Sequence, residues 1–209
     1  RINMHEETLS KNTRIILEKI APIFTSFYLA GGTALALQFG HRISVDLDFF
    51  NKDTFPISLL VEQLNALGNL KIEDQSENTF NGSLDGVKIS FFYYPYPLLF
   101  PTKEYNGVFL ADERDIGAMK VQAISGRGNK KDFVDFFVLL KKYSVEELFN
   151  FFHKKYEKFN YNQLHILKSL SYFYDADTNP EPVYIHPISW TEVKKFIKNV
   201  VDDYIKSKS

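Results

Sequence analysis

The sequence contains no cysteine, which excludes disulfides, thiol nucleophiles and cysteine-based zinc sites. It also lacks any apolar run near the ~18 residues that a membrane span needs, and no signal-peptide pattern opens it. Neither charge sign dominates, because 25 Lys and Arg residues face 26 Asp and Glu residues. Any contact with nucleic acid must therefore come from a local basic patch. We expect a cytoplasmic protein with no membrane partner.

Aromatic residues, by contrast, are plentiful. The 209 residues include 20 Phe and 12 Tyr, and 44% of the chain is hydrophobic, so a disordered chain is excluded. This length supports one sizeable core or two small domains. The chain opens with Arg1 rather than methionine, and we expect the natural start upstream of it or at Met4.

Hydrophobic periodicity divides the chain near residue 110. Before that point, helical patterns alternate with strand-like runs, and Asp85-Gly86 is a strong signal for a hairpin turn. The helices are expected at 9–24, 33–39 and 56–67, and the strands at 27–30, 43–50, 69–75, 79–84 and 87–94. After it the pattern is helical, over 113–126, 132–142, 145–157, 161–173 and 189–206. We therefore predict an α/β (α+β) fold, with a mixed sheet flanked by helices in a head of residues 1–110 and a helical region over 111–209 that completes the site and covers the head.

Two short motifs in the head carry the functional signal. Gly31-Gly32-Thr33 follows a buried strand and opens a helix, whose N-terminal N–H groups and dipole favour an anion such as a triphosphate. Asp46 and Asp48 alternate with apolar residues, so on a strand both carboxylates share one face. Two neighbouring carboxylates suit Mg²⁺, which takes its remaining ligands from substrate phosphates and water.

Each motif alone has an ordinary explanation. A Gly-Gly sequence between strand and helix is usually only a turn. An Asp-x-Asp pair is often a solvated strand face, and it also occurs in metal-dependent sugar transferases. The combination in this order and spacing is more specific than either half.

A basic block lies in the first helix of the helical region. Ile116, Lys120, Ala123 and Arg127 fall on one stripe of that helix. Lys120 therefore lies on an inward face, where an ammonium group needs an anionic partner. That partner is either a bound triphosphate or a structural carboxylate such as Asp115, unless the side chain extends to solvent.

Residues 127–131 then form a basic turn, in which glycines end one helix and Asp132 is expected to cap the next. Asp135 lies one turn further along the same face. Lysines near this turn, Lys130, Lys131, Lys141 and Lys142, stand beside aromatic residues. They suit a nucleic-acid backbone or a solvated helix face equally well.

Residues 29–35 and 41–50 together resemble the first motif of the DNA polymerase β-like nucleotidyltransferase superfamily, and more narrowly the AbiEii/AbiGii toxin-type nucleotidyltransferases. Residues 115–135 are similar to the downstream basic and acidic motif of that family. The resemblance implies a nucleotidyltransferase fold that moves a nucleotidyl group from an NTP (ATP, GTP, CTP or UTP) to an acceptor hydroxyl and releases pyrophosphate.

The resemblance also implies roles for individual residues. Asp46 and Asp48 would be catalytic and would hold Mg²⁺ or Mn²⁺, and Lys120 and Asp132 would complete the catalytic set. The nucleotide would be bound by Gly31, Gly32, Thr33, Arg42, Lys120, Arg127 and Lys131. Asp135 belongs to the same motif.

One position departs from the superfamily pattern. A third carboxylate often stands on a later strand, and here Ser90 occupies the expected position. Either two acids suffice, or Asp132, Asp135 or Glu73 supplies the third, or the protein is a degenerate member that binds a nucleotide or a partner without catalysis. The family further implies the toxin of a toxin–antitoxin or phage-defence (abortive infection) system, with RNA such as tRNA as acceptor and an antitoxin protein as partner. A small-molecule acceptor also fits the wider superfamily.

Overall fold

The computed structural model describes residues 4–208, and the chain divides into two compact units, Arg1–Asp112 and Glu113–Ser209. That the second unit completes a site on the first and covers it stays a prediction. In the part of the chain that the structure describes, no helix combines the length and the apolar character needed to cross a bilayer.

The first unit is built on a seven-stranded mixed sheet in the order β3-β4-β5-β2-β1-β7-β6. The strands are β1 (Tyr28–Ala30), β2 (Leu47–Asn51), β3 (Leu70–Ser76), β4 (Thr79–Leu84), β5 (Val87–Tyr93), β6 (Lys103–Tyr105) and β7 (Val108–Leu110). Strand β2 runs parallel to β5 and β1 runs parallel to β7, whereas the other neighbouring pairs are antiparallel. The predicted mixed sheet flanked by helices is confirmed.

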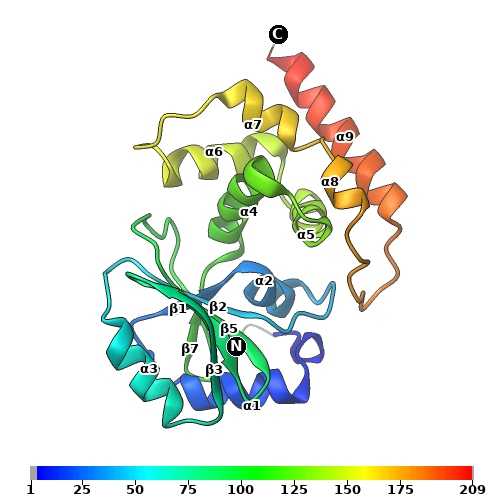
Figure 1. The fold of residues 1–209 in the computed structure, drawn as a ribbon. Coiled ribbons are helices and arrows are strands. Elements are labelled where there is room, and N and C mark those ends of the chain that lie inside the picture. Colours follow the sequence, from blue (N-terminus) through cyan, green and yellow to red (C-terminus); the bar gives the residue numbers. More distant parts are fainter. Residues whose placement is uncertain (1–3, 209) are drawn as a thin grey trace. The chain divides into compact units, whose positions relative to one another are not determined.

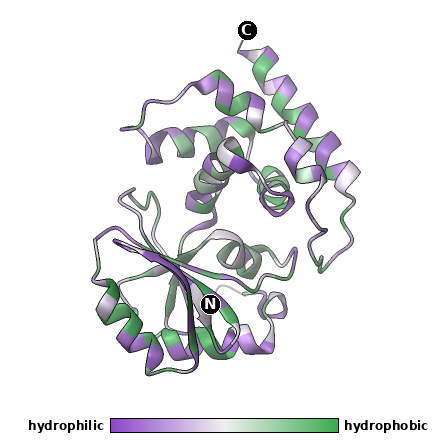
Figure 2. Cartoon of the chain, in the orientation of Figure 1, coloured by the Kyte–Doolittle hydropathy of each residue, from purple (hydrophilic) through white to green (hydrophobic). Residues whose placement is uncertain are grey.

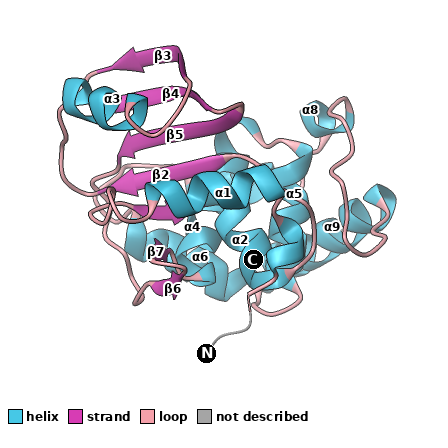
Figure 3. Cartoon of the chain, turned by 90° about the horizontal axis from the view of Figure 1, so that it is seen from below, coloured by secondary structure: helices cyan, strands magenta, loops and turns pink. Residues whose placement is uncertain are grey.

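Helices cover both faces of this sheet. They are a short 3₁₀ helix η1 (Glu6–Thr8), α1 (Lys11–Ile20), α2 (Gly31–Phe39) and α3 (Ile57–Asn65). Helices α1 and α3 lie on one face (Figure 3), and α2 lies on the other (Figure 1). Hydrophobic and hydrophilic residues alternate around α1 (Figure 2), as expected for a helix that buries one stripe.

Phenylalanine rings fill the core between the sheet and α1. Phe49 and Phe91, on neighbouring strands, stack with centroids 5.0 Å apart, and Phe24 and Phe27 pack against Phe91 at 5.0 and 5.1 Å. Phe49 and Phe91 are almost completely buried. Side chains alternate along a strand, so Asp48 on β2 and Ser90 on β5, which directly precede Phe49 and Phe91, project from the opposite face of the sheet.

The sequence predicted strand 43–50, but β2 begins only at Leu47. The backbone before it pairs elsewhere, because the N–H group of Ser44 donates to the carbonyl of Thr8 at 2.9 Å. The hairpin at Asp85-Gly86 is confirmed, and Asp85 has the positive φ of 49° expected of such a turn. The short strands β6 and β7 were not predicted.

The second unit is helical, as predicted. Its helices are α4 (Glu113–Arg127), α5 (Lys130–Leu140), α6 (Val145–Lys155), α7 (Gln163–Ser169), α8 (Tyr174–Asp177) and α9 (Trp190–Ser207). Helix α4 packs against α5, α6 and α7, and α9 packs against α5 and α6 (Figure 1). The predicted helix 161–173 is wrong after Ser169, where α7 ends, and α8 begins only at Tyr174.

A fully buried ion pair joins α4 to α6. Lys155 Nζ lies 2.8 Å from Asp115 Oδ1, and neither side chain is exposed. Burial lowers the pKa of Lys155 from its ordinary value, and the charge of Asp115 opposes that shift. Asp115, which the sequence offered as a partner of Lys120, is thus engaged by a different lysine.

Candidate active site

The candidate site of the sheet unit lies where β1 runs directly into α2. Gly31 has a φ of 69°, a conformation that L side chains rarely adopt, and a Cβ atom there would lie 3.1 Å from Asp48 Oδ2. Ala30 is the N-cap and offers no side-chain acceptor to the first turn of the helix. The start of α2 therefore presents backbone N–H groups next to a carboxylate.

Gly32 makes room for an arginine. A Cβ atom at Gly32 would lie 2.2 Å from Arg42 Nη2, so the guanidinium occupies the space that any other residue would fill. Arg42 is only 2% exposed, and its Nη1 donates to the carbonyl of Ile43 at 3.2 Å. A buried cation at the positive end of a helix dipole favours the approach of an anion.

Thr33 fixes the first aspartate. Its hydroxyl is 1% exposed, lies 2.8 Å from Ser44 Oγ and donates to the backbone carbonyl of Asp46. The sequence assigned this hydroxyl to phosphate binding, and that assignment stays a prediction. Within the structure the hydroxyl holds the backbone of Asp46 against α2, and nothing in the sequence indicated the contribution of Ser44.

Asp46 and Asp48 flank the fully buried Leu47, and both are half-buried. Asp46 lies one residue before β2, whereas Asp48 lies within it and pairs in register with Ala30. Among residues 4–208, no group of three or more His, Cys, Asp or Glu side chains is arranged to hold a metal. Two carboxylates fit Mg²⁺ or Mn²⁺ when substrate phosphates and water complete the coordination, which is the usual arrangement for Mg²⁺.

Ser90 stands directly beside Asp48, because β2 and β5 pair these two residues in register. It is 2% exposed, and Asn81 pairs with it on the next strand. Glu73 lies on β3, which is separated from β2 by β4 and β5, or about 14 Å at ~4.8 Å per strand. Of the three acids considered as substitutes for the missing carboxylate, Glu73 is therefore out of reach of Asp48.

A separate charge cluster lies within the helical unit. Lys120 Nζ lies 2.8 Å from Asp132 Oδ1 and 2.7 Å from Asp135 Oδ2. The side chain of Lys120 is 8% exposed and that of Asp135 is fully buried. The structure thus brings together three of the predicted residues, and it supplies the anionic partner that the sequence required for Lys120.

The first turn of α5 orients this cluster. The sequence predicted Asp132 as the N-cap, but the N-cap is Asn129 and the helix begins at Lys130. Asp132 is the third residue of the helix, and its Oδ2 accepts from the backbone N–H of Asn129 at 3.2 Å. One carboxylate therefore closes the helix end and also binds Lys120. Arg127 and Lys131, on either side of the turn, are exposed.

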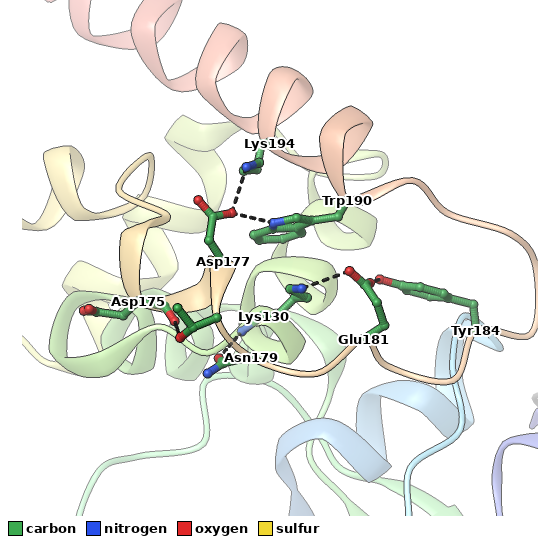
Figure 4. Close-up of polar contacts among 9 residues, drawn as sticks. Lys130, Asp175, Asp177, Asn179, Glu181, Tyr184, Trp190 and Lys194 are labelled. Atoms are coloured by element: carbon green, nitrogen blue, oxygen red, sulfur yellow. Dashed lines mark hydrogen bonds and ion pairs between the residues drawn. The ribbon is translucent and has the colours of Figure 1, made fainter.

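The loop between α8 and α9 is fastened to the same turn (Figure 4). Asn179 Oδ1 accepts from the backbone N–H of Lys130 at 3.0 Å, and Lys130 Nζ binds Glu181 at 2.9 Å and lies 5.3 Å from the ring centroid of Trp190. Trp190 Nε1 donates to Asp177 at 2.7 Å. Nothing in the sequence indicated these contacts, and the bonds from Lys130 to Asn179 and Glu181 join residues about fifty positions apart.

Two of the four lysines considered for nucleic-acid contact have partners inside the helical unit. Lys130 binds Glu181, and Lys142 Nζ lies 2.6 Å from Glu113 Oε1. The hydrogen bond to Glu113 raises the pKa of Lys142. Lys141 lies over the ring of Phe196, with 3.7 Å to the centroid.

Comparison with known proteins agrees with this geometry. The model of the family described as "Nucleotidyl transferase AbiEii toxin, Type IV TA system" matches residues 15–107. An uncharacterised protein of Aquifex aeolicus (strain VF5) is 42% identical over 212 residues, which cover 95% of this chain and 98% of the relative.

Solved structures share the fold over nearly the whole chain. MenT4, described as a nucleotidyltransferase toxin of Mycobacterium tuberculosis H37Rv, has a TM-score of 0.59 at 11% identity and covers 92% of this chain and 83% of its own. A putative nucleotidyltransferase of H. pylori has a TM-score of 0.56 at 18% identity and covers 97% and 95%. The segment of residues 15–107, which contains the start of α2 and both aspartates, belongs to the AbiEii family of nucleotidyltransferase toxins.

Proposed function

We propose that this protein transfers a nucleotidyl group from an NTP to a hydroxyl of an RNA, such as tRNA, and that it acts as the toxin of a toxin–antitoxin or phage-defence pair in the cytoplasm. The observation that carries the proposal is the arrangement at the start of α2. Arg42 fills the space left by Gly32, and Asp48 lies against Gly31. A positive helix end with a buried guanidinium suits phosphates, and the adjacent carboxylates suit a divalent cation.

The proposed reaction has a simple balance. The oxygen of the acceptor hydroxyl forms a bond to the α-phosphorus, the bond from that phosphorus to the β-phosphate oxygen breaks, pyrophosphate leaves, and the hydroxyl proton passes to water. Asp46 and Asp48 would hold Mg²⁺ or Mn²⁺. When bound there, such an ion neutralises charge at the transferring group and makes the acceptor oxygen more acidic.

The remaining residues would bind and orient the donor. Backbone N–H groups at Gly31 and Gly32 and the guanidinium of Arg42 would receive the phosphates. Thr33 would hold Asp46 in place through the hydrogen bond to its carbonyl. From the helical unit, Lys120, Arg127 and Lys131 would neutralise the triphosphate, and Asp132 and Asp135 would set the position of Lys120.

A labelling experiment tests the proposal. Purified protein is incubated with Mg²⁺, total bacterial RNA and each α-³²P-labelled NTP in turn, beside the Asp46→Asn/Asp48→Asn variant. We expect label on RNA with the intact protein alone, from a preferred NTP. Equal labelling by the variant would contradict the assignment of the two aspartates.

The alternative function is a catalytically degenerate module that binds a nucleotide or a partner protein such as an antitoxin. The specific observation in its favour is Ser90, which stands beside Asp48 where the superfamily often has a third carboxylate. Nucleotide binding by calorimetry, without label transfer to RNA, would favour this alternative over the enzyme.

A further inference from the structure

A cavity of about 690 Å³ opens at the end of the sheet where β1 begins and β2 ends. This volume is typical of small-molecule sites, which range over about 300–1,000 Å³. Its lining combines aromatic, aliphatic, polar, basic and acidic side chains, including Tyr28, Lys52, Asp53, Tyr96, Leu98 and Phe109. None of these residues takes part in the site described above.

Aromatic rings continue from this cavity across the sheet. Tyr28 stacks on Phe50, with centroids 5.9 Å apart and planes inclined by 23°, and Phe50 contacts Tyr94 at 5.2 Å. Tyr94 in turn contacts Tyr96 at 4.7 Å. Phe109 pairs in register with Tyr28 and is 39% exposed, so an aromatic surface borders the cavity.

The cavity lies close to the two aspartates. Tyr28 pairs with Phe50, and two residues further along the same antiparallel pair Ala30 faces Asp48. Phe50 and Asp48 therefore project from the same face of β2, and two residues of strand span about 7 Å. A ligand of nucleotide size can reach from the aromatic rings to the carboxylates.

We propose that this cavity binds a base at the single-stranded end of the acceptor RNA, which directs the terminal hydroxyl towards Asp46 and Asp48. The inference rests on the proposed function and adds the location of the acceptor. Aromatic faces stack on unpaired bases of any sequence, each stack contributing about 1–3 kcal/mol. The exposed Lys52 suits a backbone phosphate of such a strand.

The extent of the aromatic surface favours a strand over a mononucleotide. Phe109 is exposed, and Phe50, Tyr94 and Tyr96, which contact one another in sequence, are half-buried, so the accessible stacking surface is larger than one base requires. The base of an NTP would use only part of it. Successive bases of a strand can use the whole of it.

Photocrosslinking tests the location directly. An RNA oligonucleotide with 4-thiouridine as its last base is irradiated with the full-length protein, without NTP, and the adducts are mapped by tryptic mass spectrometry. We expect adducts in the peptides that carry Tyr28, Tyr96 and Phe109, which span residues 20–42, 89–103 and 104–114. Adducts confined to other peptides would overturn the proposal.

Variants separate the acceptor from the donor. Phe109→Ala and Tyr96→Ala should each weaken binding of the single-stranded RNA about tenfold, as expected for the loss of one stack, and should leave NTP affinity unchanged. Tyr172→Ala is the matched control, because Tyr172 is 60% exposed and lies in the helical unit. Thermal unfolding of each variant checks that it folds.

If Phe109→Ala weakens NTP binding and spares RNA binding, the cavity holds the donor base and the proposal is overturned. The crosslinking experiment is carried out without NTP, so its result does not depend on whether the transfer reaction occurs. Adducts at the cavity together with no label transfer would retain the acceptor subsite and reject the transferase. Label transfer to RNA, with adducts only in other peptides, would retain the transferase and reject the acceptor subsite.

Discussion

The charge cluster of the helical unit leads to a quantitative prediction for Lys120→Met. Lys120 lies 2.8 Å from Asp132 and 2.7 Å from Asp135, and Asp135 is fully buried. Methionine keeps most of the length and the apolar character of the lysine stem and removes the ammonium group. The buried carboxylate of Asp135 then loses the cation that lies beside it.

Removing one partner of a buried ion pair typically lowers the free energy of unfolding by about 3–5 kcal/mol, because the other charge stays buried without compensation. Replacing both partners by apolar residues is often nearly neutral. We therefore expect Lys120→Met to lower the free energy of unfolding by about 3–5 kcal/mol. The double variant Lys120→Met/Asp135→Leu should recover most of this lost stability. Asp132→Asn should cost only about 1 kcal/mol, because Asp132 is partly exposed and asparagine can still accept at the helix end.

Urea unfolding followed by far-ultraviolet circular dichroism measures these differences, and the labelling reaction is run on the same samples. The double variant is the informative one, since it should be folded and yet inactive if Lys120 binds the triphosphate. A loss below about 1 kcal/mol for Lys120→Met would refute the structural reasoning, because it falls outside the range for a broken buried pair. Full transfer activity in the double variant would refute the catalytic assignment of Lys120.

Three further predictions concern the sheet unit. Gly31→Ala should lower the free energy of unfolding by about 1–2 kcal/mol in urea titrations, because it forces alanine into a left-handed conformation beside Asp48. The control is Gly126→Ala in α4 of the helical unit, which should be neutral or stabilising because a Cβ atom there meets nothing within 4 Å. Ser90→Asp adds a second carboxylate beside Asp48, and the two like charges repel. Without Mg²⁺ the variant should therefore have a lower Tm than the wild type, and its Tm should rise more than that of the wild type when Mg²⁺ is added. An equal rise in Tm for both proteins would argue against a metal at this position. A hydrogen bond from the side chain of Lys19, and then one from the backbone N–H of Asn69, lower the pKa of Asp85, so this carboxylate stabilises the fold at pH values above about 4 and the stabilisation is lost as the pH falls through the lowered pKa. Asp85→Asn, which keeps the turn, should therefore have a lower Tm than the wild type at pH 7. A Tm difference that did not narrow on acidification would contradict this.

The features that the sequence revealed are local ones. The Asp85-Gly86 hairpin joins neighbouring strands and depends on two turn residues, and α2 depends on an apolar run that follows two glycines. The alternation correctly placed Leu47 and Phe49 in the core and Asp48 away from it, whereas Val45, which precedes β2, is 42% exposed. Each of these signals is complete within a few consecutive residues.

The features that the sequence missed depend on distant partners. The strand predicted from residue 43 begins at Leu47, because the backbone at Ser44 bonds to Thr8, far back in the chain. Strands β6 and β7 have only three residues each and were too short for a periodic signal. Helix α5 begins at Lys130, two residues before the predicted start, and the loop that holds its first turn comes from residues near Asn179.

The candidate site shows the same division. Residue types and spacing selected Asp46, Asp48 and the basic block as candidates, but they could not assign the partners of Lys120. Asp115 was the nearest candidate along the helix, yet it pairs with Lys155, and Asp132 and Asp135 reach Lys120 from the next helix. Ion-pair choice is a property of helix packing, which no single-sequence spacing rule contains.

The most direct test of the central claim asks which phosphorus is transferred. Protein, Mg²⁺ and RNA are incubated in parallel with the preferred NTP labelled with ³²P at either the α or the γ position, and RNA and released phosphates are separated. Nucleotidyl transfer predicts α-label on RNA and γ-label only in pyrophosphate, with both signals lost in Asp46→Asn/Asp48→Asn. Label from the γ position on RNA, or γ-label released as orthophosphate with no α-label on RNA, would contradict the account.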